Sequence, residues 1–305
     1  GRHGRELMIG VVRDEVFGPA ISFGLGGTLV EVFRDREIGL PPLNDFLARR
    51  LISRTKAAKL LKSMRGTPAV DREALVEMLL RVSEMATELP AIVEMDMNPV
   101  IASPDGVVAV DARIVVEPYN QAARPFDHMA IHPYPRELVQ RSDLSDGTQV
   151  TIRPIRPEDA IMEEKFVNNL SERSRYLRFM YSLQEITPEA LSRFTQIDYD
   201  REMALIGVVK KKGKEDMVGV ARYYTMPDPT VCEFAIVIGD DWQHRGIARR
   251  LMSALVEAAR DGRHTRMIGS VLTENRRMLK FVKSLGFTTE VNPDDPQLME
   301  VSLYL

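Results

Sequence analysis

The sequence predicts an α/β (α+β) protein with two domains, and three observations carry this prediction. Short apolar runs rich in β-branched residues alternate with amphipathic helical patterns along the chain. A length of 305 residues accommodates two domains of roughly 100–200 residues each. Prolines and polar residues punctuate the segment 119–147. We therefore expect a first domain at 1–118, a linker at 119–147 and a second domain at 148–305.

Composition and charge exclude several classes of protein. Hydrophobic residues make up 44% of the chain, and the net charge of −3 gives no basic bias that would favour nucleic acid as a partner. The single cysteine, Cys232, excludes an intramolecular disulfide, which fits a reducing compartment. No apolar run approaches the roughly 18 residues that span a membrane, and the polar first residues do not form a signal peptide. A cytoplasmic protein without membrane contact is expected.

The first domain is expected to combine strands with two helices and to end in a hairpin. Its elements in order are a strand at 6–13, a glycine-rich run at 17–28, a strand at 29–33, helices around 44–63 and 71–89, a strand at 91–96 and, after a turn at 104–106, a returning strand at 107–113.

Two oxygen-bearing side chains lie near the ends of the hairpin strands. Asn98 follows the strand at 91–96, and Asp111 lies in the returning strand. Together they would offer Mg²⁺ two hard oxygen ligands of the kind that it takes beside nucleotide phosphates. In an alternative of at least equal weight, Asn98 opens an Asn-Pro turn and Asp111 caps a strand.

Several short motifs of the first domain occur in the order of one known family. They are Phe17-Gly18-Pro19, Gly24-x-Gly26-Gly27, Arg65-Gly66, Glu94-x-x-x-Asn98-Pro99 and Asp111-Ala112-Arg113. Through them residues 5–117 resemble the C-terminal subdomain of the ATP-grasp domain in NDP-forming acyl-CoA synthetases. The resemblance implies a partial ATP-grasp domain whose first subdomain would precede residue 1. It implies that Mg-ATP binds, with Asn98 and Asp111 as metal ligands, only in an intact domain of the full-length protein, and that this chain alone does not make acyl-CoA.

The second domain follows the order strand, helices, three strands, helix, strand, helix and two strands. Its expected elements are a strand at 150–156, helices around 160–168, 172–179 and 188–196, strands at 203–210 and 217–224 joined by a lysine-rich turn, a buried strand at 232–238, a helix from near residue 246, a strand at 266–272, a helix at 275–285, a strand after 286–287 and a last strand at 298–304.

The junction between the buried strand and the next helix is suited to an anion. The first turn of a helix has N–H groups without internal partners and carries the positive end of the helix dipole, so it can receive a diphosphate. Gly246 and the small Ala248 let a ligand approach the backbone closely. Arg245 and Arg249 would add positive charge from the side.

This strand, loop and helix, with its Gln243-x-x-Gly246-x-Ala248 pattern, resembles the acetyl-CoA loop of the GNAT superfamily of N-acetyltransferases. The order of elements over residues 148–305 resembles that family as well. The resemblance implies a GNAT fold with a mixed central sheet flanked by helices, and acetyl-CoA as the cosubstrate. The residues that it implies for cofactor binding are Ile236, Val237, Ile238, Gln243, His244, Arg245, Gly246, Ile247, Ala248, Arg249 and Asn275.

Three further stretches of the sequence resemble one particular group of acetyltransferases. His132-Pro133-Tyr134-Pro135 and the runs 153–159 and 171–179 look like those of Pat-type protein lysine acetyltransferases, which join an acyl-CoA synthetase-like region to a C-terminal GNAT domain. This resemblance implies acetyl transfer to lysines of metabolic enzymes, acyl-CoA synthetases especially. It also implies a regulatory role for the synthetase-like half.

Glu233 on the buried strand is the candidate general base. A solvated lysine has a pKa near 10.4, so a group of the enzyme must remove the proton before the amine attacks. Many GNAT enzymes hold a glutamate in this strand, and the alternative is a charged strand residue paired with a neighbouring arginine. Strand alternation puts Cys232 on the opposite face, where a core thiol rather than a nucleophile is expected. The general acid stays unassigned, because Val282 lies seven residues after Asn275, where many GNAT enzymes have a tyrosine.

Two rival functions remain beside protein lysine acetylation. The second domain can act on a small-molecule amine, or it can sense acyl-CoA without catalysis. Glu233 separates an enzyme from a sensor, because only an enzyme needs the base.

Overall fold

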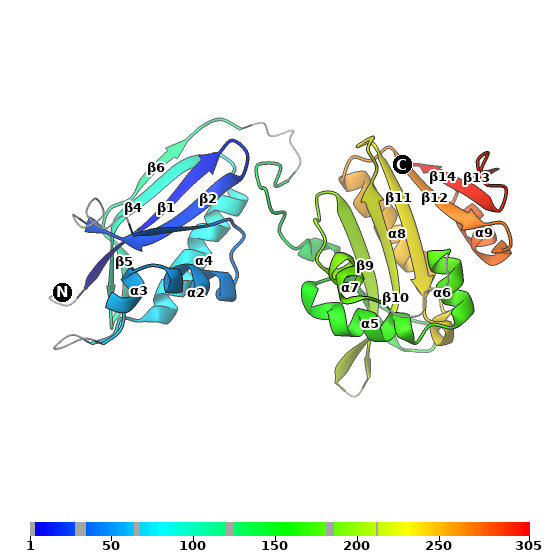
Figure 1. The fold of residues 1–305 in the computed structure, drawn as a ribbon, viewed down its shortest axis with the longest axis horizontal. Helices are drawn as coiled ribbons and strands as arrows, with labels where there is room; N and C mark the ends of the chain where they lie inside the picture. Colours follow the sequence, from blue (N-terminus) through cyan, green and yellow to red (C-terminus); the bar gives the residue numbers. More distant parts are fainter. Residues whose placement is uncertain (1–3, 28–34, 64–67, 120–124, 181–185, 212) are drawn as a thin grey trace. The chain divides into compact units, whose positions relative to one another are not determined.

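The computed structural model describes residues 4–27, 35–63, 68–119, 125–180, 186–211 and 213–305 (Figure 1). The chain divides after Pro133 into two compact units, each with its own sheet and core. None of the helices in the described ranges is long and apolar enough to cross a membrane. The strand expected at 29–33, the last residue of the glycine-rich run and Arg65-Gly66 lie outside the described residues.

The first unit is an antiparallel sheet with helices packed on it (Figure 1). The strands run in the order β3-β2-β1-β4-β5, and β6 also pairs with β4. Its elements are β1 (Arg5–Asp14), β2 (Gly18–Leu25), β3 (Arg36–Gly39), α2 (Asp45–Arg54), α3 (Ala57–Leu60), α4 (Arg72–Glu88), β4 (Ile92–Ser103), β5 (Gly106–Ala109) and β6 (Arg113–Val116).

Helix α4 shows why this unit folds as it does. The Asp71 side chain caps the helix by accepting from the Ala74 N–H, and Leu75, Val76, Leu79 and Val82 recur at helical spacing on the buried side. These residues join Phe23 and Ile21 of the sheet in one apolar core. Burial of this stripe fixes α4 on the sheet.

Two expectations for this unit need correction. The helix expected at 44–63 is interrupted at Thr55, which is extended, and the buried Asp35 carboxylate accepts from the backbone N–H groups of Lys56 and Ala57 at 2.6 and 2.7 Å. The strand expected at 107–113 ends at Ala109, and β6 begins separately at Arg113. Both breaks depend on partners far along the chain.

The second unit is an eight-stranded sheet in the order β13-β14-β12-β11-β10-β9-β8-β7. All its strand pairs are antiparallel except β11 with β12. The mixed sheet flanked by helices confirms the expected fold class. Its elements are the 3-10 turns η2 (Arg136–Leu138), η3 (Pro157–Asp159) and η4 (Asp240–Trp242), the strands β7 (Gln140–Asp143), β8 (Gln149–Pro154), β9 (Glu202–Lys211), β10 (Lys214–Thr225), β11 (Val231–Ile238), β12 (Arg266–Leu272), β13 (Thr288–Val291) and β14 (Leu298–Tyr304), and the helices α5 (Ala160–Asn168), α6 (Glu172–Phe179), α7 (Pro188–Thr195), α8 (Ile247–Asp261) and α9 (Arg276–Lys283).

Helices cover both faces of this sheet (Figure 1). Residues of α8 and α9 share one core with Cys232 and Phe234, whereas residues of α5 and α7 share the other core with Val237. The expected alternation along the central strand is therefore confirmed.

The linker expected at 119–147 differs from the structure in its second part. Residues from Tyr134 onward belong to the second unit, and β7 pairs in register with β8 from Gln140 opposite Ile152 to Asp143 opposite Gln149. The prolines at 125, 133 and 135 all precede this strand. A proline removes a strand-pairing hydrogen bond only at its own position, so a strand can follow these prolines in the sequence. The proline-rich composition of the segment therefore did not reveal it.

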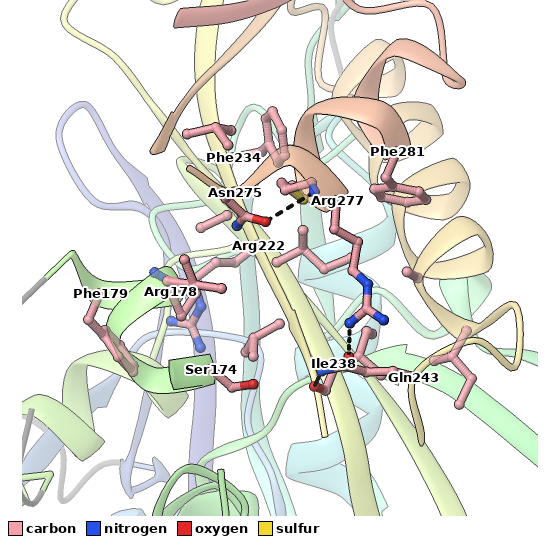
Figure 2. A pocket seen from close by; sticks show the side chains of 18 of the residues that line it. Ser174, Arg178, Phe179, Arg222, Phe234, Ile238, Gln243, Asn275, Arg277 and Phe281 are labelled. Atoms are coloured by element: carbon pink, nitrogen blue, oxygen red, sulfur yellow. Dashed lines mark hydrogen bonds between the residues drawn. The ribbon is translucent and has the colours of Figure 1, made fainter. Parts of the chain in front are cut away.

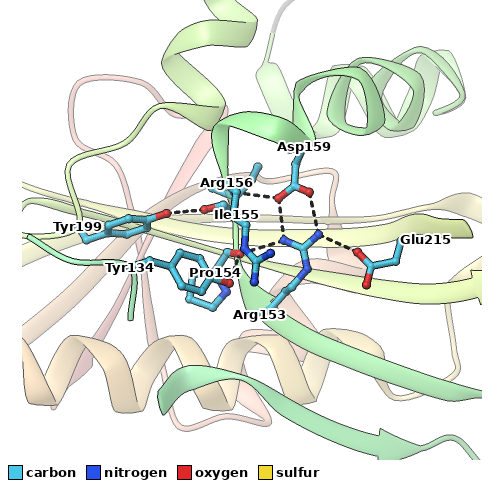
Figure 3. A network of polar contacts seen from close by, with 8 residues as sticks. All are labelled: Tyr134, Arg153, Pro154, Ile155, Arg156, Asp159, Tyr199 and Glu215. Carbon is cyan, nitrogen blue, oxygen red and sulfur yellow. Dashed lines mark hydrogen bonds and ion pairs between the residues drawn. The ribbon is translucent and has the colours of Figure 1, made fainter. Parts of the chain in front are cut away.

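A buried ion-pair network fixes the start of the second unit (Figure 3). Arg153 of β8 donates to both carboxylate oxygens of Asp159 at 2.7 Å and to Glu215 of β10 at 2.9 Å. The side chains of Arg153 and Asp159 are only 7% and 8% exposed. Beside them, the Tyr199 hydroxyl donates to the Ile155 carbonyl at 2.6 Å. The network therefore joins β8, η3 and β10.

Candidate functional site

The central feature of the second unit is the point where β11 and β12 part. The two parallel strands pair only from Val231 to Glu233 against Arg266 to Ile268, while β11 continues along β10 as far as Ile238. The space that opens is a cavity of about 820 Å³ between β11, α6, the start of α8 and α9, which we call the cleft (Figure 2).

The last residues of β11 present backbone to the cleft. Ile236, Val237 and Ile238 line it. Among the described residues, none of this part of β11 is paired with a residue of β12. An unpaired strand edge can accept an extended chain as an added strand. The edge therefore suits an arm that carries amide groups.

The loop between β11 and α8 forms an anion site at one end of the cleft, which we call the anion loop (residues 243–249). His244 and Gly246 have left-handed φ angles of 65° and 82°, and α8 begins directly after Gly246 without a side-chain cap. No acidic residue stands in the first turn of α8. A Cβ added at Gly246 would meet nothing within 4 Å, so the space beside this glycine is open, and the N–H groups of the first helical turn have no partner within the helix. This geometry fits a diphosphate.

The structure brings six of the seven predicted residues of the anion loop to the cleft. The lining includes Gln243, His244, Gly246, Ile247, Ala248 and Arg249. Arg245 instead pairs with Asp146 of the turn between β7 and β8 at 2.8 Å, and its guanidinium lies 4.8 Å from the centre of the Trp242 ring. Because Arg245 binds the Asp146 carboxylate, 99 residues away in the sequence, its side chain does not line the cleft.

Asn275 also lines the cleft and caps α9, where its Oδ1 accepts from the Met278 N–H at 3.1 Å. Arg277, two residues further on, was not predicted. Its Nη1 donates to Gln243 Oε1 at 2.8 Å, and its Nη2 donates to His244 Nε2 (Figure 2). Nothing in the sequence separates Arg277 from its exposed neighbour Arg276, because both stand in the first turn of the same helix.

Glu233 lies where the two strands part and lines the cleft. Its Oε2 accepts a hydrogen bond from the Tyr224 hydroxyl, and the two residues are direct cross-strand partners. Burial, and then the hydrogen bond with Glu233, raise the pKa of Tyr224 to about 12, so the phenol remains a donor at neutral pH. Tyr224 was missed, although counting the hairpin register from the turn after Thr225 would have found it.

Cys232 is not suited to act as a nucleophile. Cys232 is fully buried in the core beneath α8, and burial raises the pKa of its thiol to about 12. A protonated thiol behind the sheet cannot serve as an acyl acceptor at neutral pH.

The opposite end of the cleft is lined by α6 and β10. Leu177, Phe179 and Met180 supply apolar surface there beside the cationic Arg173 and Arg178, and Arg222 of β10 lines this end as well. The Arg222 guanidinium lies 3.4 Å from the buried Glu163 carboxylate, whose pKa is raised by burial. This end therefore combines apolar and cationic side chains, with the Arg222–Glu163 pair beside them.

Asp240 holds α6 against the start of α8. Its carboxylate accepts from the Ser171 N–H, the Ser171 hydroxyl and the Ser174 hydroxyl at 2.8, 2.9 and 2.6 Å. Two walls of the cleft, 66 to 69 residues apart in the chain, thus share one anchor.

In the first unit, Asn98 Oδ1 accepts from the Gly27 N–H at 2.8 Å. Asp111 is exposed and follows Val110, whose N–H donates to the Pro99 carbonyl at 3.0 Å. Within the described ranges, no group of three or more histidine, cysteine, aspartate or glutamate side chains is arranged to hold a metal ion. The pairing of Asn98 and Asp111 as magnesium ligands stays a prediction for an intact ATP-grasp domain.

Comparison with known proteins agrees with this division. Residues 149–288 match the family of acetyltransferase (GNAT) domains, and residues 1–116 match the family of ATP-grasp domains. Over 152 residues, 50% of this chain and 82% of the relative, the sequence is 36% identical to "Acetyltransferase PA5475" of Pseudomonas aeruginosa. The GNAT domain of S. lividans PAT has a similar fold, with a TM-score of 0.52 at 24% identity over 57% of this chain and 100% of that chain.

The first unit has relatives of another kind. Over 113 residues, 37% of this chain, it is 42% identical to the beta subunit of ADP-forming acetate–CoA ligase I of Pyrococcus furiosus. The match spans about half, 49%, of that subunit.

Fold and cleft together define an acyltransferase of the GNAT type. The chain belongs to the GNAT acetyltransferase family, and it is an N-acetyltransferase with an ATP-grasp fragment ahead of the acetyltransferase domain.

Proposed function

We propose that this chain transfers the acetyl group of acetyl-CoA to the ε-amino group of lysines in proteins such as acyl-CoA synthetases, with Glu233 as the general base. The observation that carries the proposal is the position of Glu233. It stands at the parting of β11 and β12, between the anion loop at one end of the cleft and the apolar wall of α6 at the other. A group there can reach an amine that approaches a thioester along β11.

The chain offers matching groups for each part of acetyl-CoA. The uncapped first turn of α8 suits the diphosphate, and the free edge of β11 suits the amide-bearing pantetheine arm. A backbone N–H of the same edge can stabilise negative charge on the acetyl carbonyl oxygen.

The chemistry then needs one proton acceptor. Glu233 takes one proton from the attacking ammonium, the amine nitrogen bonds to the acetyl carbon, and the carbon–sulfur bond breaks with its electron pair leaving on sulfur, which takes up the second proton that the nitrogen releases. Tyr224 donates a hydrogen bond to the Glu233 carboxylate and so holds it in place. No acyl-enzyme is needed, since Cys232 lies behind the sheet.

A lysine side chain fits the α6 end of the cleft. Its four-carbon stem needs apolar surface while its amine reaches inward, and Leu177, Phe179 and Met180 provide that surface beside Arg173 and Arg178. Acyl-CoA synthetases are proposed as acceptors because the first unit is similar to a subunit of such an enzyme, which ties this protein to acyl-CoA metabolism.

The acceptor is tested with labelled acetyl-CoA and an AMP-forming acetyl-CoA synthetase. We expect the label on lysine side chains of the synthetase, located by peptide mass spectrometry. Polyamines and free amino acids in parallel reactions serve as competing acceptors. Label on these small amines alone would contradict a protein substrate and favour the small-molecule activity.

Replacement of Gly246 by aspartate tests the anion loop. A carboxylate at this position would point into the open space before α8 and repel a diphosphate, so we expect the Kd for CoA to rise roughly 100-fold or more in calorimetry. Gly213→Asp is the matched control, because Gly213 has a similar φ of +79° with nothing within 4 Å, and lies in the turn between β9 and β10. Equal loss of affinity in both variants would show backbone strain rather than a site.

A further inference from the structure

Arg277 connects α9 to the anion loop across the cleft. Its side chain leaves the first turn of α9 and reaches the anion loop, where it donates to Gln243 Oε1 and His244 Nε2 (Figure 2). Gln243 in turn donates through Nε2 to the carbonyl of Ile238 at 3.4 Å. A chain of hydrogen bonds thus runs from α9 through the anion loop to the end of β11.

The partners of Arg277 are not carboxylates. A guanidinium has only donors, so it donates to Gln243 and His244 in these contacts. Among the described residues no carboxylate forms an ion pair with Arg277, whereas Arg245 pairs with Asp146 and Arg266 pairs with Glu300. Arg277 therefore keeps an exposed, uncompensated cation over the cleft.

A planar guanidinium beside uncapped helix N–H groups is suited to phosphate oxygens. Arginine binds such groups with two parallel hydrogen bonds, which are stronger than bonds to neutral acceptors such as an amide or an imidazole. An anion at the start of α8 can therefore compete for Arg277 against Gln243 and His244.

We propose that Arg277 is a phosphate ligand of the cleft, which moves from Gln243 and His244 to the diphosphate of the acyl-CoA and holds α9 over the bound molecule. The inference rests on the proposed use of acetyl-CoA and adds a residue from α9 to the anion loop. Arg277 thereby favours a phosphorylated acyl donor over a bare pantetheine thioester.

The test compares three ligands by calorimetry on the full chain, first with three proteins and then with Arg277→Lys. The ligands are CoA, dephospho-CoA, which keeps the diphosphate, and pantetheine, which has no phosphate. The proteins are the wild type, Arg277→Ala and Arg276→Ala, the last as a control because Arg276 is exposed in the same helical turn and does not line the cleft.

We expect Arg277→Ala to raise the Kd of both CoA and dephospho-CoA by roughly 10- to 100-fold, the range of a hydrogen-bonded contact to a charged group. The Kd of pantetheine should stay unchanged, and Arg276→Ala should change none of the three. Arg277→Lys should recover part of the loss, because it restores the charge without the paired donors.

Three outcomes would overturn the proposal. An equal loss for pantetheine would mean that Arg277 only shapes the anion loop, and a loss confined to CoA would place the contact at the 3′-phosphate instead. Unchanged affinity for all ligands would remove Arg277 from the site. Failure of the wild type to bind CoA would contradict the proposed function itself, so the two hypotheses fail in different ways.

Discussion

Replacement of Glu233 by glutamine is expected to lower kcat for acetyl transfer by roughly 10²- to 10⁴-fold, the usual contribution of general base catalysis. Glutamine keeps the shape of the side chain and can still pair with Tyr224 across the strands, but it cannot take a proton. The Kd of CoA should stay unchanged, because Glu233 lies on β11 and is not part of the anion loop. Initial rates with labelled acetyl-CoA and calorimetry measure the two effects separately.

The pH dependence sharpens this test. Free lysine loses its proton near pH 10.4, so the deficit of Glu233→Gln should shrink as the pH approaches that value. Tyr224→Phe keeps the carboxylate but removes its hydrogen bond, so we expect it to lower kcat less than Glu233→Gln does. Turnover by Glu233→Gln equal to that of the wild type across this range would exclude Glu233 as the base.

Removal of Arg153 is expected to destabilise the second unit by about 3–5 kcal/mol. Arg153→Ala would leave the Asp159 carboxylate, 8% exposed, without the cation that compensates its burial, and Glu215 would lose its partner as well. Trp242, the only tryptophan of the chain, lies in this unit, so its fluorescence follows unfolding in urea without a signal from the first unit.

A surface pair provides the control for this variant. Lys165 and Asp216 pair at 2.6 Å with side chains 60% and 33% exposed, and Lys165→Ala should cost less than about 1 kcal/mol. If both variants shifted the urea midpoint equally, the buried network would carry no special stabilisation.

Local patterns in the sequence were sufficient for much of the fold. The two-residue period of β11 separated Glu233 from Cys232, and the small residues Gly246 and Ala248 marked the loop before α8 as one that a ligand can approach. Both follow from rules of strand pleat and backbone sterics that act over a few residues.

Contacts between distant parts of the chain account for what was missed. Asp146 draws Arg245 from the cleft, and Arg277 reaches Gln243 from a different helix. Neither contact produces a repeating pattern in the sequence, because an exposed arginine has many acceptable partners. The strand β7 was hidden by the prolines before it, and its pairing with β8 became visible only in the sheet.

The carboxylate of Asp240 has a consequence for the order in which substrates bind. It belongs to the turn before the anion loop, yet it anchors the first turn of α6, which forms the opposite wall. A donor molecule that orders the turn would order α6 as well, and by thermodynamic reciprocity an acceptor seated against α6 would tighten donor binding. Although burial alone would raise the pKa of Asp240, hydrogen bonds from Ser171 and Ser174 hold it below its usual value. The contact between the turn and α6 therefore persists at neutral pH and weakens only in acid, when the carboxylate takes up a proton.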